Sequence, residues 1–210
     1  MTMASAYPCL VPQRKTGSER FHCNGIDAGF DLASFWQWSV SDLVSNATRG
    51  ILAEYIVAQA LGVAGRIRNE WDSFDLTTTA GVKVEVKSAA YVQTWYQRKL
   101  SDVIFRYGPK RGFDAATNTV EREPRWQADV YVFALLKHRY KSTIDPLNIG
   151  QWEFYCLRTS TLQSRTRSKV LITLKSLQKL DVKPVGFDGL KKAIEDAARP
   201  NASLSAPTGP

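Results

Sequence analysis

The clearest alternation of apolar and polar residues lies in one short segment near the middle of the chain. Its positions fall into two sets, the apolar Val82, Val84 and Val86 and the charged Lys83, Glu85 and Lys87. Successive side chains on a strand point to opposite faces, so residues 82–88 are predicted to form a strand whose valines face a core. The charged set then shares the other face, with Glu85 and Lys87 pointing the same way.

A second strand is predicted directly before this one, over residues 75–79. The connection Thr79-Ala80-Gly81 has the length of a hairpin turn and a glycine for a positive φ angle. With the turn centred on Ala80, Asp75 lies directly across from Glu85, where Cβ atoms are about 5 Å apart. Two such carboxylates repel each other, and a divalent cation bound through oxygen removes that repulsion. The hairpin is therefore a candidate metal site, and the alternative is an amphipathic hairpin with a solvated polar face.

Patterns on either side of this hairpin predict the other elements. The predicted helices are residues 39–61, in two pieces broken near Gly50 and ended by Gly62, and residues 90–100, 174–180 and 187–198. The predicted strands are residues 129–136 and 152–157, both strongly apolar. This order of elements indicates an α/β fold, with a central mixed β-sheet flanked by helices.

The length of 210 residues suits one domain with a substantial core. We expect a flexible N-terminal arm over residues 1–25, a single domain over residues 26–199 and a disordered tail over residues 200–210. No apolar run approaches the roughly 20 residues of a membrane span. The first ten residues also lack the pattern of a secretory signal, so a cytoplasmic location is expected.

The net charge of +8 favours a polyanionic partner, with nucleic acid first and a membrane surface second. The excess is concentrated, because residues 154–180 contain no Asp or Glu, and a second basic stretch spans residues 98–111. The candidate phosphate contacts in these stretches are Arg98, Lys99, Arg158, Arg165, Arg167 and Lys169. The alternative is a solvated basic face. Three scattered cysteines and two histidines indicate neither a disulfide framework nor a zinc site, which leaves carboxylates and lysines as the chemical groups.

A third acidic residue belongs with the hairpin. Residues 51–61 are apolar on nearly every side, as in a buried helix, and Glu54 is their only charge. A buried carboxylate without a partner is costly. Two partners stay open: an arginine such as Arg49 in a structural ion pair, or the same metal centre.

A glutamate on an early helix, followed by Asp-(x9)-Glu-x-Lys across a hairpin, resembles the PD-(D/E)XK nuclease superfamily, which has a restriction-endonuclease-like fold. Asp75 matches the metal-binding aspartate of that motif, Glu85 the second acid and Lys87 the lysine, while Glu54 matches the glutamate of the first core helix. Gln93 resembles a glutamine that follows the lysine in several branches of the superfamily.

The match covers about residues 45–100. It departs from the motif at Phe74, where the name of the motif has proline, and Asp72 competes with Asp75 for the aspartate role.

The resemblance implies a Mg²⁺-dependent endonuclease that hydrolyses DNA phosphodiester bonds in restriction, repair or defence, with Mn²⁺ as a substitute ion. It implies that Asp75, Glu85, Glu54 and the carbonyl of Val86 hold the metal, and that Lys87 and Gln93 complete the catalytic set. DNA is the expected partner, and a homodimer would suit the cutting of both strands. Two alternatives stay open: a non-catalytic nucleic-acid-binding protein of the same fold, and a structural or interaction protein in which the polar face of the hairpin is simply solvated.

Overall fold

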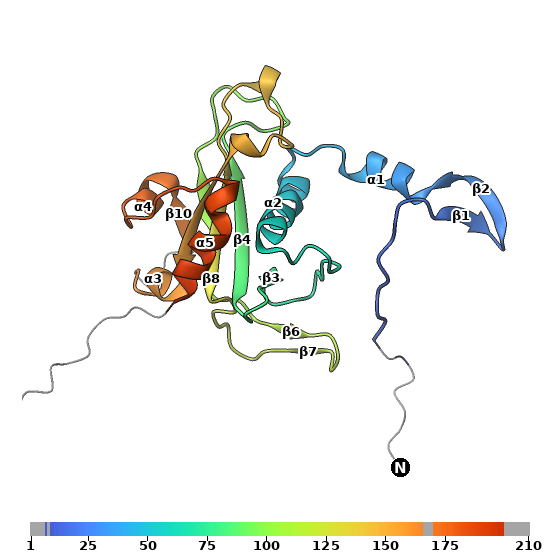
Figure 1. Ribbon diagram of the computed structural model, residues 1–210, viewed down its shortest axis with the longest axis horizontal. Coiled ribbons are helices and arrows are strands. Elements are labelled where there is room, and N and C mark those ends of the chain that lie inside the picture. The colour runs from blue at the N-terminus through green and yellow to red at the C-terminus, as the bar shows by residue number, and fades with distance from the viewer. Residues whose placement is uncertain (1–6, 8, 166–169, 200–210) are drawn as a thin grey trace, which may run out of the picture.

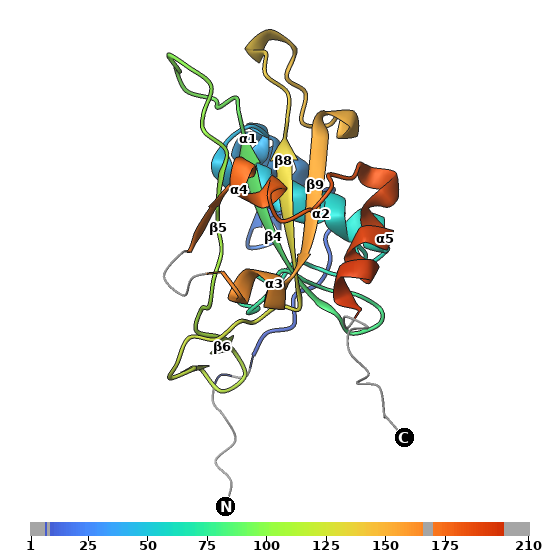
Figure 2. The same cartoon turned by 90° about the vertical axis from the view of Figure 1, so that its left-hand side faces the viewer.

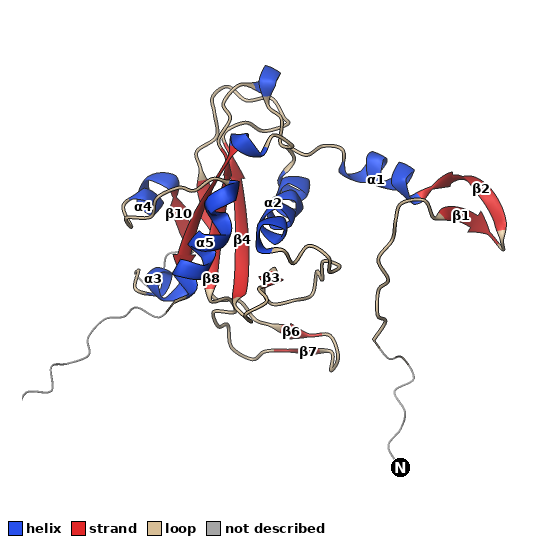
Figure 3. Ribbon diagram, viewed as in Figure 1, coloured by secondary structure: helices blue, strands red, loops and turns tan. Residues whose placement is uncertain are grey.

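The computed structural model describes residue 7, residues 9–165 and residues 170–199, and the predicted disordered tail lies outside this part of the chain. Its centre is a four-stranded sheet in the order β3-β4-β8-β9 (Figures 1 and 3). The strands are β3 (Leu76–Thr77), β4 (Lys83–Ala90), β8 (Val130–Leu136) and β9 (Trp152–Arg158). β4 and β8 are parallel, whereas β3 and β9 run antiparallel to their neighbours. The mixed sheet flanked by helices confirms the predicted α/β fold.

Each face of the sheet packs against its own set of elements. On one face, α2 (Asn46–Leu61) and α5 (Phe187–Ala198) cover the valines of β4. On the other face lie α3 (Thr159–Gln163), α4 (Leu174–Gln178) and the small sheet of β5 (Ile104–Arg106) with β10 (Leu171–Thr173). Figure 2, viewed from the side of α4, shows α3 and α4 in front of the sheet and α2 behind it. Every residue of β8 is buried, because this central strand is covered on both faces.

The predicted strands 129–136 and 152–157 and the helix 187–198 are confirmed within a residue or two. The two-piece helix 39–61 is wrong, because α2 begins at Asn46 and passes through Gly50 without a break. The glycine at position 62 does end the helix, in the left-handed conformation with φ 71°. The predicted helix 90–100 is also wrong: these residues form an irregular segment, held by the side chains of Gln93 and Gln97, which bond backbone groups within it.

The remaining short elements lie at the edges of the domain. They are the hairpin of β6 (Phe113–Asp114) and β7 (Thr119–Val120) and two 3₁₀ turns, Lys141–Thr143 and Ile149–Gln151. No helix among the described residues is both long enough and apolar enough to cross a membrane.

An N-terminal unit projects from the domain beyond α2 (Figure 1). It consists of the antiparallel strands β1 (Arg20–Cys23) and β2 (Ile26–Asp31), followed by α1 (Leu32–Val40). Asn24 and Gly25 make the two-residue turn between the strands, both with positive φ, as the sequence Asn-Gly favours. The expected boundary between arm and domain at residues 25 and 26 therefore falls inside this hairpin.

Replacing either of two glycines in the α2 region with alanine should change the free energy of unfolding, and the two changes should have opposite signs. Gly62→Ala places a Cβ on a left-handed residue and should lower the free energy of unfolding by about 1 kcal/mol. Gly50→Ala, inside the helix after its first turn and with nothing within 4 Å of the new Cβ, should raise it by roughly 0.5–1 kcal/mol. Urea unfolding of both variants measures this, and a shift of the same sign in both would contradict the assigned end of α2.

Candidate active site

The predicted register of the central hairpin is confirmed. Leu76 pairs with Val84 and Thr77 with Lys83, so the next position brings Asp75 opposite Glu85. β3 ends there, and the side chain of Asp75 continues the pairing: its Oδ2 accepts a hydrogen bond of 2.7 Å from the N–H of Val86. Gly81 takes the expected positive φ, 82°, in the connecting turn. This geometry fixes the carboxylate of Asp75 against the open edge of β4.

Glu85 is almost completely buried, with 2% of its surface exposed. Its Oε1 accepts hydrogen bonds from Nζ of Lys87 at 2.6 Å and from Nζ of Lys110 at 2.8 Å, and its Oε2 accepts from Lys110 at 3.0 Å. A buried carboxylate is tolerated when it is paired and hydrogen-bonded, and these two ammonium groups provide both. Lys87 lies on the same strand face as Glu85, as the alternation predicts, whereas Lys110 comes from the segment after β5.

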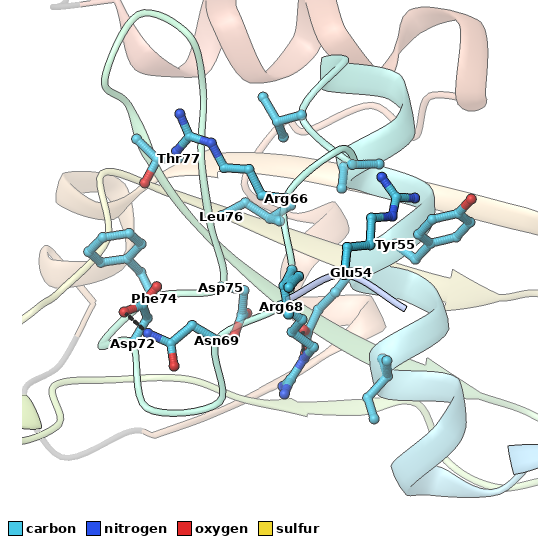
Figure 4. Close-up of a pocket in the computed structure, with 16 residues that line it drawn as sticks. Glu54, Tyr55, Arg66, Arg68, Asn69, Asp72, Phe74, Asp75, Leu76 and Thr77 are labelled. Atoms are coloured by element: carbon cyan, nitrogen blue, oxygen red, sulfur yellow. Dashed lines mark hydrogen bonds and ion pairs between the residues drawn. The ribbon is translucent and has the colours of Figure 1, made fainter. Parts of the chain in front are cut away.

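Glu54 forms an ion pair with an arginine, one of the two partners that the sequence left open, but the arginine is Arg68. Arg68, in the segment between α2 and β3, donates from Nε to Oε2 of Glu54 at 2.5 Å and from Nη2 to Oε1 at 3.2 Å. Figure 4 shows this pair with Asp75 nearby, in a cavity of about 300 Å³ lined by all three residues. The suggested partner Arg49 is wrong, because its guanidinium group faces other residues.

The three acids influence one another electrostatically. Burial raises the pKa of Asp75 to about 6, and the charges of Glu85 and Glu54 push it in the same direction. Lys87 and the hydrogen bond from Val86 oppose the rise. The hydrogen bond to Glu54 raises the pKa of Arg68, and the charge of Asp75 adds to the effect. The site therefore balances three carboxylates against three cations, and burial is the main cause of the raised pKa of Asp75.

Carboxylate oxygens are the ligands that Mg²⁺ prefers, and the opposed pair Asp75 and Glu85 fits a divalent ion in this respect. Among the described residues no three His, Cys, Asp or Glu side chains gather as a ready metal-binding group, and Glu54 faces Arg68. The competing Asp72 is exposed and accepts a hydrogen bond from Asn69 at 2.7 Å. The hairpin register thus places Asp75, and not Asp72, opposite Glu85.

Gln93 and Arg49 lie beyond Lys87, where β4 ends. Gln93 is buried, and its side chain bonds the carbonyl of Ala90 and Nη1 of Arg49. Arg49 also bonds the carbonyl of Val44, Oδ1 of Asn46 and Oγ of Ser88. All of these acceptors are uncharged. A separate cavity of about 340 Å³ is lined by Arg49, Gln93, Lys87 and Arg106, together with one acid, Asp102.

The candidate phosphate contacts are scattered over the surface. Arg98 and Lys99 are exposed in the segment after Gln93, and Lys99 lies 3.8 Å from a carboxylate oxygen of Asp102. Arg158 donates to the carbonyls of Ala197 and Ala198 at the end of α5. Nε of Arg165 is buried without a hydrogen-bond partner in the described part of the chain. Arg167 and Lys169 lie outside the described residues.

Sequence reasoning missed two residues of the site, Lys110 and Arg68. Lys110 stood in a basic stretch, which was a usable signal for positive charge, but nothing in the sequence connects it to Glu85. Arg68 lies in an irregular segment between α2 and β3, with no periodic pattern that could orient it. Both are brought to the site by loops.

Opposed carboxylates and lysines on a mixed α/β sheet define an enzyme-like, charge-rich centre, and the comparison with known families agrees with a nuclease. The sequence model of the family "Bacteriophage T4 endonuclease IV" matches residues 33–172, about two thirds of the chain. The protein belongs to this nuclease family. The matched region contains Glu54, Asp75, Glu85, Lys87 and Lys110. No curated protein matches the sequence.

Asp75→Asn should make the free energy of unfolding less dependent on pH. A carboxyl group whose pKa is about 6 in the folded protein, against a usual 3.8, stabilises the fold while it is protonated. That stabilisation is complete below the usual value and is lost as the pH rises through 6. Between about pH 4 and about pH 7.5, the wild type should therefore lose up to about 3 kcal/mol that the variant keeps. Urea unfolding in EDTA at both pH values measures the difference.

Asp75→Ala is the matched control, because it removes the charge and also the acceptor for the Val86 N–H. It should be less stable than Asp75→Asn by roughly 1–3 kcal/mol at both pH values. If Asp75→Asn is instead as unstable as Asp75→Ala at neutral pH, the repulsion inferred at the site is wrong.

Proposed function

We propose that the protein is a Mg²⁺-dependent endonuclease that hydrolyses DNA phosphodiester bonds in the cytoplasm, built on a restriction-endonuclease-like core of the PD-(D/E)XK superfamily. The observation that carries the proposal is the opposition of Asp75 and Glu85 at the open edge of β4, with Lys87 beside them. Membership in the T4 endonuclease IV family supports DNA cleavage. A role in restriction, repair or defence is compatible with such an activity.

In this proposal the metal is held by Asp75, Glu85 and the carbonyl of Val86. The N–H of Val86 donates to Asp75, and on a strand the N–H and C=O of one residue point to the same side. The carbonyl of Val86 therefore faces the open edge as well. When bound, Mg²⁺ or its substitute Mn²⁺ lowers the pKa of a coordinated water and stabilises charge on a phosphate. Glu54 is close enough to influence Asp75 and would hold the ion through water, with Arg68 as its structural partner.

Lys87 and Lys110 supply the fixed positive charge beside the reacting phosphate. An ammonium group has three N–H donors, and each lysine keeps at least one that Glu85 does not use. These donors can bind the charge that develops on a phosphate oxygen. Glu85 holds both ammonium groups in place, so it positions the lysines in addition to its role at the metal. Gln93 does not contact the metal in this proposal; its side-chain oxygen accepts a hydrogen bond from Arg49 and orients the guanidinium group.

The cavity beyond Lys87 is the proposed contact for a neighbouring phosphate of the nucleic acid. Arg49 is buried, its acceptors are all neutral, and burial lowers its pKa, which marks an uncompensated cation. Hydrogen bonds within the described part of the chain occupy four of its five N–H donors, which leaves one for a ligand. Arg106 and Lys87 line the same cavity. Arg98 and Lys99, on the adjoining segment, extend this basic track.

The alternative is a non-catalytic nucleic-acid-binding protein of the same fold. The opposed carboxylates favour the enzyme, because a surface that only binds polyanions gains nothing from Asp75 and Glu85. Calorimetric titration with Mg²⁺ separates the two functions, since only the enzyme needs a site that Asp75→Asn and Glu85→Gln remove. A homodimer would bring two such sites to the two strands of a duplex.

Cleavage of plasmid, linear and single-stranded DNA with Mg²⁺, Mn²⁺ or EDTA tests the proposed activity. Asp75→Asn and Glu85→Gln should abolish cleavage, and Lys87→Ala should slow it by about 100- to 1,000-fold, because its charge acts on the reacting phosphate. Lys191→Ala, an exposed lysine on α5, is the control and should cleave like the wild type. Cleavage that persists in EDTA, or in Lys87→Ala at the wild-type rate, would contradict the mechanism.

Binding of the inactive Glu85→Gln protein to a DNA duplex should weaken steeply with salt. Adding Arg106→Gln should lower the slope of log affinity against log salt by about one, because one phosphate contact is lost. Adding Lys191→Gln should leave the slope unchanged. Fluorescence anisotropy over a salt series measures both, and equal slopes for the two variants would place the nucleic acid away from the cavity of Arg49 and Arg106.

A further inference from the structure

The projecting N-terminal unit, residues 19–40, exposes an unusual amount of apolar surface. α1 has no buried residue, and Trp38 is 85% exposed. Two aromatic pairs stand on the unit, Phe35 with Trp38 on α1 and Phe21 with Phe30 on the hairpin. Further exposed apolar residues are Ile26, Trp36 and Val40. A two-stranded hairpin and a nine-residue helix bury too little apolar surface to be stable while this much apolar surface stays exposed to water. The unit therefore needs a partner.

The unit is held away from its own domain at both ends. Before it, Nη1 of Arg14 donates to the carbonyl of Gly65 at 3.2 Å. After it, Oδ1 of Asp42 accepts from Oγ1 of Thr94 at 3.0 Å and from the N–H groups of Val44 and Ser45. These bonds tie both ends to the domain, and Figure 1 shows the unit projecting away from it.

The unit also packs on the segment just before it: the ring of Trp36 lies over Gly17, where an added Cβ would come within 2.9 Å of the ring. The backbone of α1 is also bonded to the preceding segment, through Leu32 N–H to the carbonyl of Glu19 and Ala33 N–H to that of Gly17. The unit is therefore a defined body and presents one set of exposed aromatics.

The charge of the unit identifies the kind of surface that covers it. Residues 19–40 contain three acids, Glu19, Asp27 and Asp31, and one base, Arg20, whereas the whole chain carries +8. An acidic surface repels nucleic acid and an anionic membrane. It is complementary to a basic protein surface, and the remainder of this chain is one.

The same chain also has an exposed apolar face that could receive the unit. On α2, Ile51 and Tyr55 are four residues apart on one side of the helix and are 46% and 51% exposed. Ile67 is 41% exposed and lines the same cavity as both. The charged residues of this lining are the bases Arg14, Arg66 and Arg68 and the acids Glu54, Asp72 and Asp75. The apolar groups here match those of the unit, and Arg66, which forms no ion pair among the described residues, can meet its acids.

We propose that two copies of this chain form a dimer by reciprocal exchange, in which the projecting unit of each copy docks on the outer face of α2 of the other. Trp38 is the central anchor, and Ile51 with Tyr55 is the receiving surface. The exposed apolar residues of one unit amount to on the order of 800 Å², comparable to one partner's share of a standard interface. The docked unit borders the cavity that holds Glu54 and Asp75, so the dimer would set the two candidate sites in a fixed relation.

Sedimentation velocity over a concentration series tests the dimer directly. The wild type should show the mass of two copies, and Trp38→Ser should weaken association at least about 30-fold, as expected for a central tryptophan anchor. Ile51→Asp, which sets a charge against the acidic unit, should weaken it similarly. Tyr140→Ser, an equally prominent aromatic at 71% exposure outside both surfaces, is the matched control and should dimerise like the wild type. Circular dichroism and melting curves confirm that each variant is folded.

Mixing the two defective variants tests the exchange itself. A heterodimer of Trp38→Ser with Ile51→Asp retains one intact contact, between the wild-type unit of one copy and the wild-type α2 of the other, whereas each homodimer retains none. The mixture should therefore associate more strongly than either variant alone. The proposal would be overturned if the wild type kept the mass of one copy up to about 100 μM, or if either Trp38→Ser or Ile51→Asp dimerised like the wild type. It would also be overturned if a monomeric Trp38→Ser protein bound DNA more weakly than the wild type, because the unit would then contact DNA. Mass is measured without cleavage, so this inference and the proposed nuclease activity can fail separately.

Discussion

The buried carboxylate of Glu85 is the constraint around which the candidate site is arranged. Its charge is buried in the central sheet, and Lys87 and Lys110 neutralise it. Removing both partners would leave a charge whose burial costs several kcal/mol. The segment that carries Lys110 therefore has to close over β4, and the charged face of the strand becomes a cavity wall instead of open surface. The lysines serve the fold and the proposed chemistry through the same contact.

Asp75 and Glu54 complete this arrangement from two other directions. Asp75 enters from the hairpin and Glu54 from α2, and each has one strong partner, the Val86 N–H and Arg68. The raised pKa of Asp75 reflects its burial first, and then the charges of Glu85 and Glu54. Closely opposed carboxylate oxygens are well suited to a divalent cation, and the proposed nuclease activity depends on that property.

Much of this could be predicted from the sequence, because the decisive information was local. The alternation of residues 82–88 and the position of Gly81 were enough to place Asp75 opposite Glu85. The strongly apolar segments of β8 and β9 were equally clear. The helix expected over residues 90–100 failed because side-chain bonds from Gln93 and Gln97, invisible to periodicity, fold that segment irregularly. Lys110 and Arg68 reach the site on loops, and the partner of a loop cation depends on tertiary closure that no spacing rule encodes.

Because β3 is short, part of one edge of the central sheet has no neighbouring strand in the described part of the chain. Beyond Val84, the described residues provide no further strand on the β3 side of β4, which leaves backbone groups at an edge of the central sheet. Such an edge is a template on which another chain can add a strand. Here Asp75 occupies one of the edge N–H groups, and the charged side chains of Glu85 and Lys87 lie along the same stretch. Asp75 thus also blocks part of this edge against an added strand, so Asp75→Ala would expose the N–H of Val86 as well as weaken the candidate metal site.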